Sequence, residues 1–310
     1  MNTFIVLIQS LLDRIRQMAQ QIRLKQFFAD PFLFLIPLAI LYFILMVGFG
    51  LSWYKFNSQK PIVKRSLHYF PFPAAYVNGG VVWSSQLDDQ VGFVTQFSEK
   101  TGQSQVAVNQ APAKIFDRLI ENKLIEREAA KNGLKVTARE VNEAYKKITD
   151  QHGGEQDVTK LLLNLYGMTP ADFKKLVASE LIKQKIKDEL LVNVKVRHIL
   201  VKDEKRAKDI LDKLKSGGKF EDLAKEFSED TNSREKGGDL GFIRRGQLND
   251  KFENAAFGTK PGELYGDPVK TDQGFEIIKV DERKGKVDKT YEKWLEDLKA
   301  STRVVRFVKI

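Results

Sequence analysis

The fold is decided by the stretch from Val194 to Arg283, in which three β-like pieces are separated by helical patterns. Residues 195–201 read KVRHILV, residues 237–243 read GGDLGFI, and residues 274–280 read GFEIIKV. The first and last pieces alternate in character and are rich in β-branched residues, whereas the middle piece is a strand entry bracketed by glycines. The stretch therefore predicts strands with helices between them.

Length, charge and cysteine content limit the function classes that need to be considered. The chain has 310 residues, enough for about two domains with real cores. Its net charge of +10 arises where lysines and glutamates are interleaved, which is typical of solvated helix faces, and no nucleic-acid motif accompanies it. The absence of cysteine excludes disulfides, a thiol nucleophile, a zinc–thiolate site and a lipid-modified cysteine anchor.

A membrane anchor is predicted near the amino terminus. Residues 31–54 contain no charge and are rich in Phe, Leu and Ile, and 24 residues at about 1.5 Å each span a bilayer core. The apolar run starts too late and is too long for a cleaved signal peptide. Within residues 1–30, positions 4–28 carry an apolar helical stripe, which is compatible either with a helix lying in the headgroup region or with a solvated helix.

The charges flanking the predicted span do not decide its orientation. Four cations lie on each side, so the positive-inside rule gives a tie. The long carboxyl-terminal part favours an extracytoplasmic location, because large domains are translocated regardless of nearby charge. We therefore expect a single-pass cell-membrane protein with a cytoplasmic amino terminus and extracytoplasmic carboxyl-terminal domains.

Residues 55–74 are proline-containing and predict a linker, and residues 75–192 predict a small helical domain. Asn78-Gly79 lies between two short apolar runs, which is a hairpin signal. Thr137 and Thr169 are each followed three residues later by an acidic residue, and this spacing predicts the amino-terminal caps of two helices. Short helices with apolar faces must pack on one another, which predicts a helical domain.

Two family resemblances cover most of the chain. The KVRHILV, GGDLGFI and GFEIIKV motifs make residues 193–285 similar to a parvulin-type peptidyl-prolyl cis/trans isomerase domain. Residues 77–79, 119–137 and 167–173 make the preceding region similar to the amino-terminal chaperone domain of SurA-like and PrsA-like bacterial foldases. The resemblances imply an α+β protein with a single transmembrane helix, a small all-helical chaperone domain, and a four-stranded antiparallel sheet flanked by helices.

The last segment, residues 286–310, contains a helical pattern over 290–300 and a strand pattern over 303–308. The foldase resemblance implies that the chain's end returns to the chaperone domain. We therefore predict that residues 303–309 pair with the hairpin around Val77 and Val82, which would make the isomerase domain an insertion.

Isomerisation of an Xaa–Pro bond requires no metal, cofactor or covalent step. Its barrier of roughly 18–20 kcal/mol falls when amide resonance is weakened, and a catalyst needs an apolar socket and a few oriented polar groups. The resemblance implies a socket formed by Leu240, Leu248 and Phe252, with Phe257 behind them. Core packing is the alternative reading for Leu240 and Phe257.

The resemblance also implies the polar groups of the site. His198 matches the family's first histidine, and Asp230 matches the position where relatives carry Cys or Asp facing the twisting peptide. Thr271 and Gln273 fall where relatives place polar groups that support the histidines. A hydrogen-bonded core histidine and a surface aspartate are the alternatives for the first two residues.

This chain departs from the family pattern at Glu276, which replaces the usual second histidine. A carboxylate beside His198 would favour the imidazolium and raise the pKa of His198. Phosphate-directed relatives carry an arginine-rich loop after the first strand, whereas residues 202–207 here lead almost directly into a helix. Specificity for phosphoserine or phosphothreonine is therefore not expected.

Two functions follow from these patterns. The first is a membrane-anchored peptidyl-prolyl isomerase and chaperone that assists folding of secreted or extracytoplasmic proteins, with unfolded or proline-containing polypeptides as clients. The second is a peptide-binding holdase or scaffold whose parvulin domain is catalytically weak or silent. A weaker third possibility is a structural subunit of a membrane complex that makes contact through residues 4–28. No nucleic-acid partner, metal or cofactor is expected.

Overall fold

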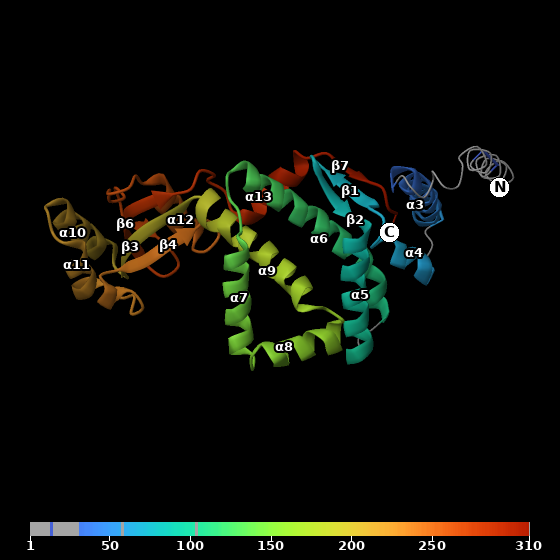
Figure 1. The fold of residues 1–310 in the computed structure, drawn as a ribbon. Coiled ribbons are helices and arrows are strands. Elements are labelled where there is room, and N and C mark those ends of the chain that lie inside the picture. The colour runs from blue at the N-terminus through green and yellow to red at the C-terminus, as the bar shows by residue number, and fades with distance from the viewer. Residues whose placement is uncertain (1–12, 15–30, 57–58, 103–104, 310) are drawn as a thin grey trace. The chain divides into compact units, whose positions relative to one another are not determined.

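The computed structural model describes residues 13–14, 31–56, 59–102 and 105–309 (Figure 1). The amphipathic helix expected over residues 4–28 lies outside the described residues, apart from positions 13 and 14. The chain forms two compact units, described in turn below. The first contains the described residues up to 74, residues 83–88 and the last residues from 306; the second contains residues 75–82 and 89–305.

The first unit is built on α3 (Pro31–Tyr54), an uncharged helix of 24 residues. Within the described residues, α3 is the one helix long and apolar enough to cross a membrane, with a mean hydropathy of 2.3 over residues 35–54. Large apolar side chains such as Leu35, Phe43 and Leu51 are exposed along it. A contiguous apolar surface of this kind indicates an interface rather than a water-facing helix.

Two side-chain hydrogen bonds connect the end of α3 to residues that follow it in the chain. The indole N–H of Trp53 donates to Ser84 Oγ at 3.0 Å, and the Tyr54 hydroxyl donates to the Pro73 carbonyl at 2.7 Å. The segment predicted as a linker contains a short helix, α4 (Pro61–Ser66), which begins at Pro61. Proline is pre-organised for the first helical position, which explains why a helix forms where only a linker was expected.

A three-stranded sheet has the order β2-β1-β7. Its strands are β1 (Pro73–Val77), β2 (Gly80–Trp83) and β7 (Val304–Arg306). Asn78 and Gly79 adopt φ angles of 41° and 85°, as the tight turn between β1 and β2 requires. The N–H of Phe307 donates to the Ala74 carbonyl at 2.9 Å. The pairing predicted for the carboxyl-terminal residues is therefore present between β7 and β1.

Helices occupy the region from residue 84 to residue 190. They are α5 (Ser84–Thr101), α6 (Gln105–Lys131), α7 (Ala138–Gln151), α8 (Glu155–Leu161), α9 (Pro170–Lys185) and the π-helical turns η1 (Leu162–Tyr166) and η2 (Ile186–Leu190). Thr137 and Thr169 form the two predicted caps, and the structure shows each as a capping box, with Glu140 and Asp172. Trp294 of α13 (Tyr291–Ala300) is buried in one cluster with residues of α6, α9 and η2.

The second sheet has four antiparallel strands in the order β4-β3-β6-β5, which confirms the expected architecture. Its strands are β3 (Asn193–Val201), β4 (Asp239–Arg244), β5 (Val269–Lys270) and β6 (Phe275–Lys284). The connecting helices are α10 (Glu204–Lys215), α11 (Phe220–Phe227), the 3₁₀ turn η3 (Arg234–Lys236) and α12 (Asp250–Gly258). Figure 1 shows α10 and α11 side by side next to this sheet.

Strand alternation divides the core of this sheet in two. Ile199, Val201 and Ile277 pack with α10 and α11, whereas Val196 and Ile278 pack with α12. The second group marks the face of the sheet on which His198 and Glu276 lie.

Candidate functional site

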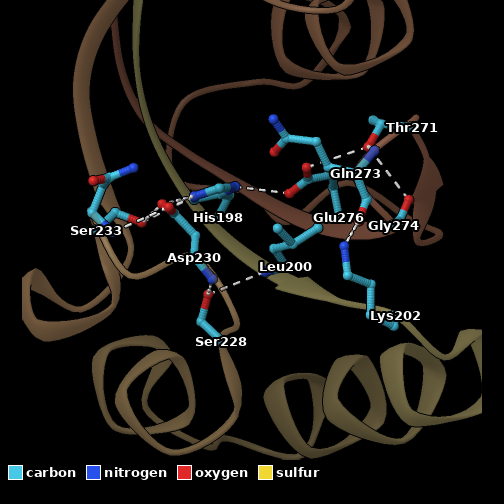
Figure 2. Close-up of polar contacts among 11 residues, drawn as sticks. His198, Leu200, Lys202, Ser228, Asp230, Ser233, Thr271, Gln273, Gly274 and Glu276 are labelled. Carbon is cyan, nitrogen blue, oxygen red and sulfur yellow. Dashed lines mark hydrogen bonds and ion pairs between the residues drawn. The ribbon is translucent and has the colours of Figure 1, made fainter.

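Strand register brings His198 and Glu276 together. His198 lies opposite Ile278 in the pairing of β3 with β6, and Glu276 lies two residues before Ile278. The two side chains therefore share the α12 face as diagonal neighbours. His198 is 5% exposed and Glu276 is 4% exposed. The Nδ1 atom of His198 lies 2.8 Å from Glu276 Oε2 (Figure 2).

The loop after α11 supplies the partners of the other ring nitrogen. His198 Nε2 lies 2.9 Å from Asp230 Oδ2 and 3.0 Å from Ser233 Oγ, and the Ser233 hydroxyl donates to the same Asp230 oxygen. Figure 2 shows the imidazole between this pair on one side and Glu276 on the other. Ser228 ties the loop to β3, because its Oγ accepts from the Leu200 N–H at 3.2 Å.

The two carboxylates set the charge of the imidazole. Burial alone would lower the pKa of His198, but hydrogen bonds and charges from Glu276 and Asp230 outweigh burial, so the pKa lies above the ordinary 6.5. Burial alone would raise the pKa of Asp230, but Ser233, His198 and the Asn232 N–H stabilise its ionised form and lower the pKa to about 2. The two carboxylates thus favour the imidazolium form of His198.

Serine, histidine and a carboxylate in this order invite comparison with a nucleophilic triad. Ser233 is fully buried, and its hydroxyl proton is committed to Asp230 rather than to His198. A serine nucleophile needs an adjacent free base that accepts its proton. The Ser233 proton goes to Asp230, and the two carboxylates favour the protonated ring, which cannot accept it, so the arrangement does not support acyl transfer.

An apolar socket opens beside the imidazole. A cavity of about 360 Å³ is lined by apolar and polar side chains: Leu240, Leu248, Phe252, His198, Asp230, Asn232, Asn249, Thr271, Asp272, Gln273 and Glu276. The His198 and Phe252 rings meet edge to face, with centroids 6.0 Å apart. Eight of the nine residues expected from the sequence therefore lie around one cavity.

Phe257 is the exception among those nine. It is buried in the core between α12 and the sheet, with the guanidinium of Arg245 over its ring at 4.4 Å. Phe257 thus has the core-packing role that was the alternative expectation to a place behind the socket. The reason is helical geometry, since Phe257 lies five residues, well over one turn, beyond Phe252 on α12.

The polar residues from the β5–β6 connection have unequal contacts. The Thr271 hydroxyl lies 3.5 Å from Glu276 Oε1, at the limit of a hydrogen bond, and 3.4 Å from the Gly274 carbonyl. Gln273 lines the cavity and is exposed. Its backbone carbonyl accepts a hydrogen bond from Lys202 Nζ. Thr271 thus supports Glu276, whereas the Gln273 side chain remains available at the cavity.

Sequence reasoning missed Ser233 and Glu253. Ser233 follows Asp230 by three residues, a spacing that closes one turn and could have indicated a shared hydrogen bond. Glu253 accepts from the N–H groups of Gly246, Gln247 and Leu248. No local signal distinguishes Glu253 from the many exposed glutamates on helices of this chain. No cluster of three His, Cys, Asp or Glu side chains suited to a metal ion occurs among the described residues.

Comparison with known proteins agrees with this geometry. Residues 179–284 match the PPIC-type PPIase domain, and residues 11–187, more than half of the chain, match the SurA-like N-terminal domain. The foldase protein PrsA of Geobacillus kaustophilus is 32% identical over 204 residues, covering 63% of this chain and 67% of that protein. The chain belongs to the SurA-like and PrsA-like foldase family.

Other PrsA proteins match this foldase-family chain over a smaller share of their length. PrsA of Exiguobacterium sibiricum is 37% identical over 202 residues, covering 60% of this chain and 66% of that protein. The chain spans between about half and two thirds of the first curated relatives it matches. A crystal structure of PrsA from Bacillus anthracis is 34% identical, covering 60% of this chain and 86% of that one, with a TM-score of 0.31.

The pKa shifts of Asp230 and His198 predict how the stability of this foldase-family domain depends on pH. Because the folded-state pKa of Asp230 is lowered from 3.8 to about 2, its contribution is complete above pH 3.8 and is lost as the pH falls towards 2. His198 has a raised pKa, so its contribution is complete below pH 6.5 and is lost as the pH rises through its higher folded-state value. Thermal unfolding of native protein and of Asp230→Asn should therefore converge between pH 4 and 2, and an unchanged difference would contradict this assignment.

Proposed function

We propose that this chain catalyses cis/trans isomerisation of Xaa–Pro bonds in unfolded polypeptides and acts as a chaperone for extracytoplasmic proteins. The observation that carries the proposal is the open socket, whose apolar walls meet a buried imidazole and two carboxylates within a PPIC-type domain. A socket of this size accepts a proline ring, and its polar groups face where the amide would twist.

Each side chain has a distinct role in this proposal. Leu240, Leu248 and Phe252 bind the proline ring and exclude water from the amide. In its protonated form His198 donates both ring N–H groups to carboxylates, 2.8 and 2.9 Å away, so it orients charge rather than transferring a proton. Asp230 presents a carboxylate to the cavity, and negative charge near the substrate carbonyl disfavours the charge-separated amide resonance form.

The proposal extends to the rest of the chain. Residues 31–54 anchor the protein in the cell membrane, with the amino terminus cytoplasmic and the later domains outside. Residues 75–192 hold clients, residues 193–285 isomerise their prolyl bonds, and residues 286–310 return to the helical domain. The length and apolar surface of α3 and the pairing of β7 with β1 support this arrangement.

Catalysis and passive holding are separated by a rate measurement. The full-length chain in detergent micelles should accelerate exchange between the cis and trans forms of a proline tetrapeptide, measured by NMR exchange spectroscopy. His198→Ala and Glu276→His variants accompany the native chain. If the native chain is folded and binds the peptide without accelerating exchange, the holdase function replaces the isomerase function.

Leu248→Ala should separate binding from stability. Leu248 is 40% exposed, so its truncation should change unfolding free energy by less than about 0.5 kcal/mol. Loss of a socket wall should lower kcat/KM for the tetrapeptide by about 10- to 100-fold. Phe242→Ala is the matched control, because Phe242 is 41% exposed on β4, the strand that leads into the Leu248 turn, and is absent from the cavity lining. Equal effects of the two substitutions would argue against the socket.

A further inference from the structure

Glu253 carries a buried charge that the proposed catalytic arrangement does not use. It lies in the first turn of α12 and is 4% exposed, and no ion pair to it is found among the described residues. A buried carboxylate is costly unless its oxygens are satisfied by good hydrogen bonds. Its partners therefore show what holds it in place.

The three hydrogen-bond donors to its carboxylate are backbone N–H groups of one turn, and the Arg245 guanidinium beside that turn adds a longer-range charge interaction. Gly246 donates to Glu253 Oε2 at 2.9 Å, and Gln247 and Leu248 donate to Oε1, each at 2.8 Å. Gly246 has a φ of 85°, a left-handed conformation that glycine adopts without strain. Charge-assisted bonds of this kind are about twice as strong as neutral ones, so the turn is held tightly.

The turn and the helix start carry two walls of the same socket. Leu248 ends the turn, and Phe252 immediately precedes Glu253 on α12; both line the cavity. Leu248 is too exposed to be fixed by core packing, so its position depends on the backbone of the turn. The Glu253 carboxylate thus links the turn that carries exposed Leu248 to the helix that carries buried Phe252.

We propose that Glu253 is a positioning residue that fixes Leu248 at the rim of the socket and thereby sets the affinity for proline-containing peptides. The inference rests on the proposed function. A turn that opened would leave the carboxylate buried without donors, so the rim is pre-organised before a peptide arrives. Pre-organisation of this kind raises affinity by lowering the ordering cost of binding.

The test substitutes Glu253→Gln in the full-length chain. Glutamine keeps one accepting oxygen, but the NH2 group that replaces the other oxygen can only donate, so at least one of the three bonds is lost. Amide hydrogen exchange at Gly246, Gln247 and Leu248 should become at least tenfold faster, while exchange at Val196 in β3 remains within twofold. The Kd for a proline tetrapeptide, measured by NMR titration, should rise by about 5- to 20-fold. Glu282→Gln, an exposed glutamate on β6, is the matched control.

A double-mutant cycle separates positioning from a general structural role. If Glu253 acts through Leu248, adding Glu253→Gln to Leu248→Ala should change the Kd by less than twofold. Additive effects, or unchanged exchange in the turn, would overturn the role of Glu253 while leaving the proposed function intact. If the native chain binds no proline peptide, the proposed function fails, and the affinity role of Glu253 fails with it.

Discussion

Replacing His198 by alanine is expected to lower the opening free energy of the β4-β3-β6-β5 sheet by about 3–5 kcal/mol near pH 7. The substitution leaves Glu276, which is almost fully buried, without its cation. Removing one partner of a buried pair costs more than the pair contributes, because an uncompensated charge remains. Amide hydrogen exchange in the centres of β3 and β6 measures this opening.

The reason given for this loss can be tested by removing the orphaned charge. The double variant His198→Ala/Glu276→Gln should recover a substantial part of the lost stability, since a neutral amide replaces the buried carboxylate. Leaving Asp230 without its cation should cost less stability than leaving Glu276 without it, because the Asp230 side chain is 16% exposed. A double variant no more stable than His198→Ala alone would show that lost packing, and not charge, causes the effect.

Elements with local signals could be predicted from the sequence. The strands of the second sheet follow the alternation in the KVRHILV and GFEIIKV motifs, and Thr137 and Thr169 form caps because capping depends on residues three apart. The residues around the socket could be predicted because their motifs resemble those of a known family. Register explains why Glu276 reaches His198: the two residues share a face of adjacent strands.

Features that depend on tertiary contacts could not be predicted in the same way. Glu253 is buried by the turn folding back over it, and its sequence neighbours Asp250 and Lys251 are exposed. Ser233 becomes part of the site because the loop after α11 packs against His198, 35 residues away. Helix α4 was not expected within the linker, because proline is common both in extended segments and at the first position of a helix. Pro61 therefore gave only a weak helix-starting signal.

Phe252→Ala is expected to have the second largest effect, because it removes both core volume and a socket wall. Phe252 is buried in the cluster between α12 and the sheet, and its truncation should cost about 3–5 kcal/mol of unfolding free energy. It also meets the His198 ring edge to face. Peptide affinity should therefore fall by at least 100-fold, measured by NMR titration at a temperature where the variant is still folded.

Phe257→Ala provides the control that separates these two consequences. Phe257 is the same residue type, lies in the same cluster on the same helix and is equally buried, but it is absent from the cavity lining. Its truncation should lower stability by a similar amount while the tetrapeptide Kd changes by less than about threefold, because the socket wall is retained. If Phe257→Ala weakened binding as much as Phe252→Ala, the loss would reflect general loosening of the core, and Phe252 would have no specific role in gripping proline.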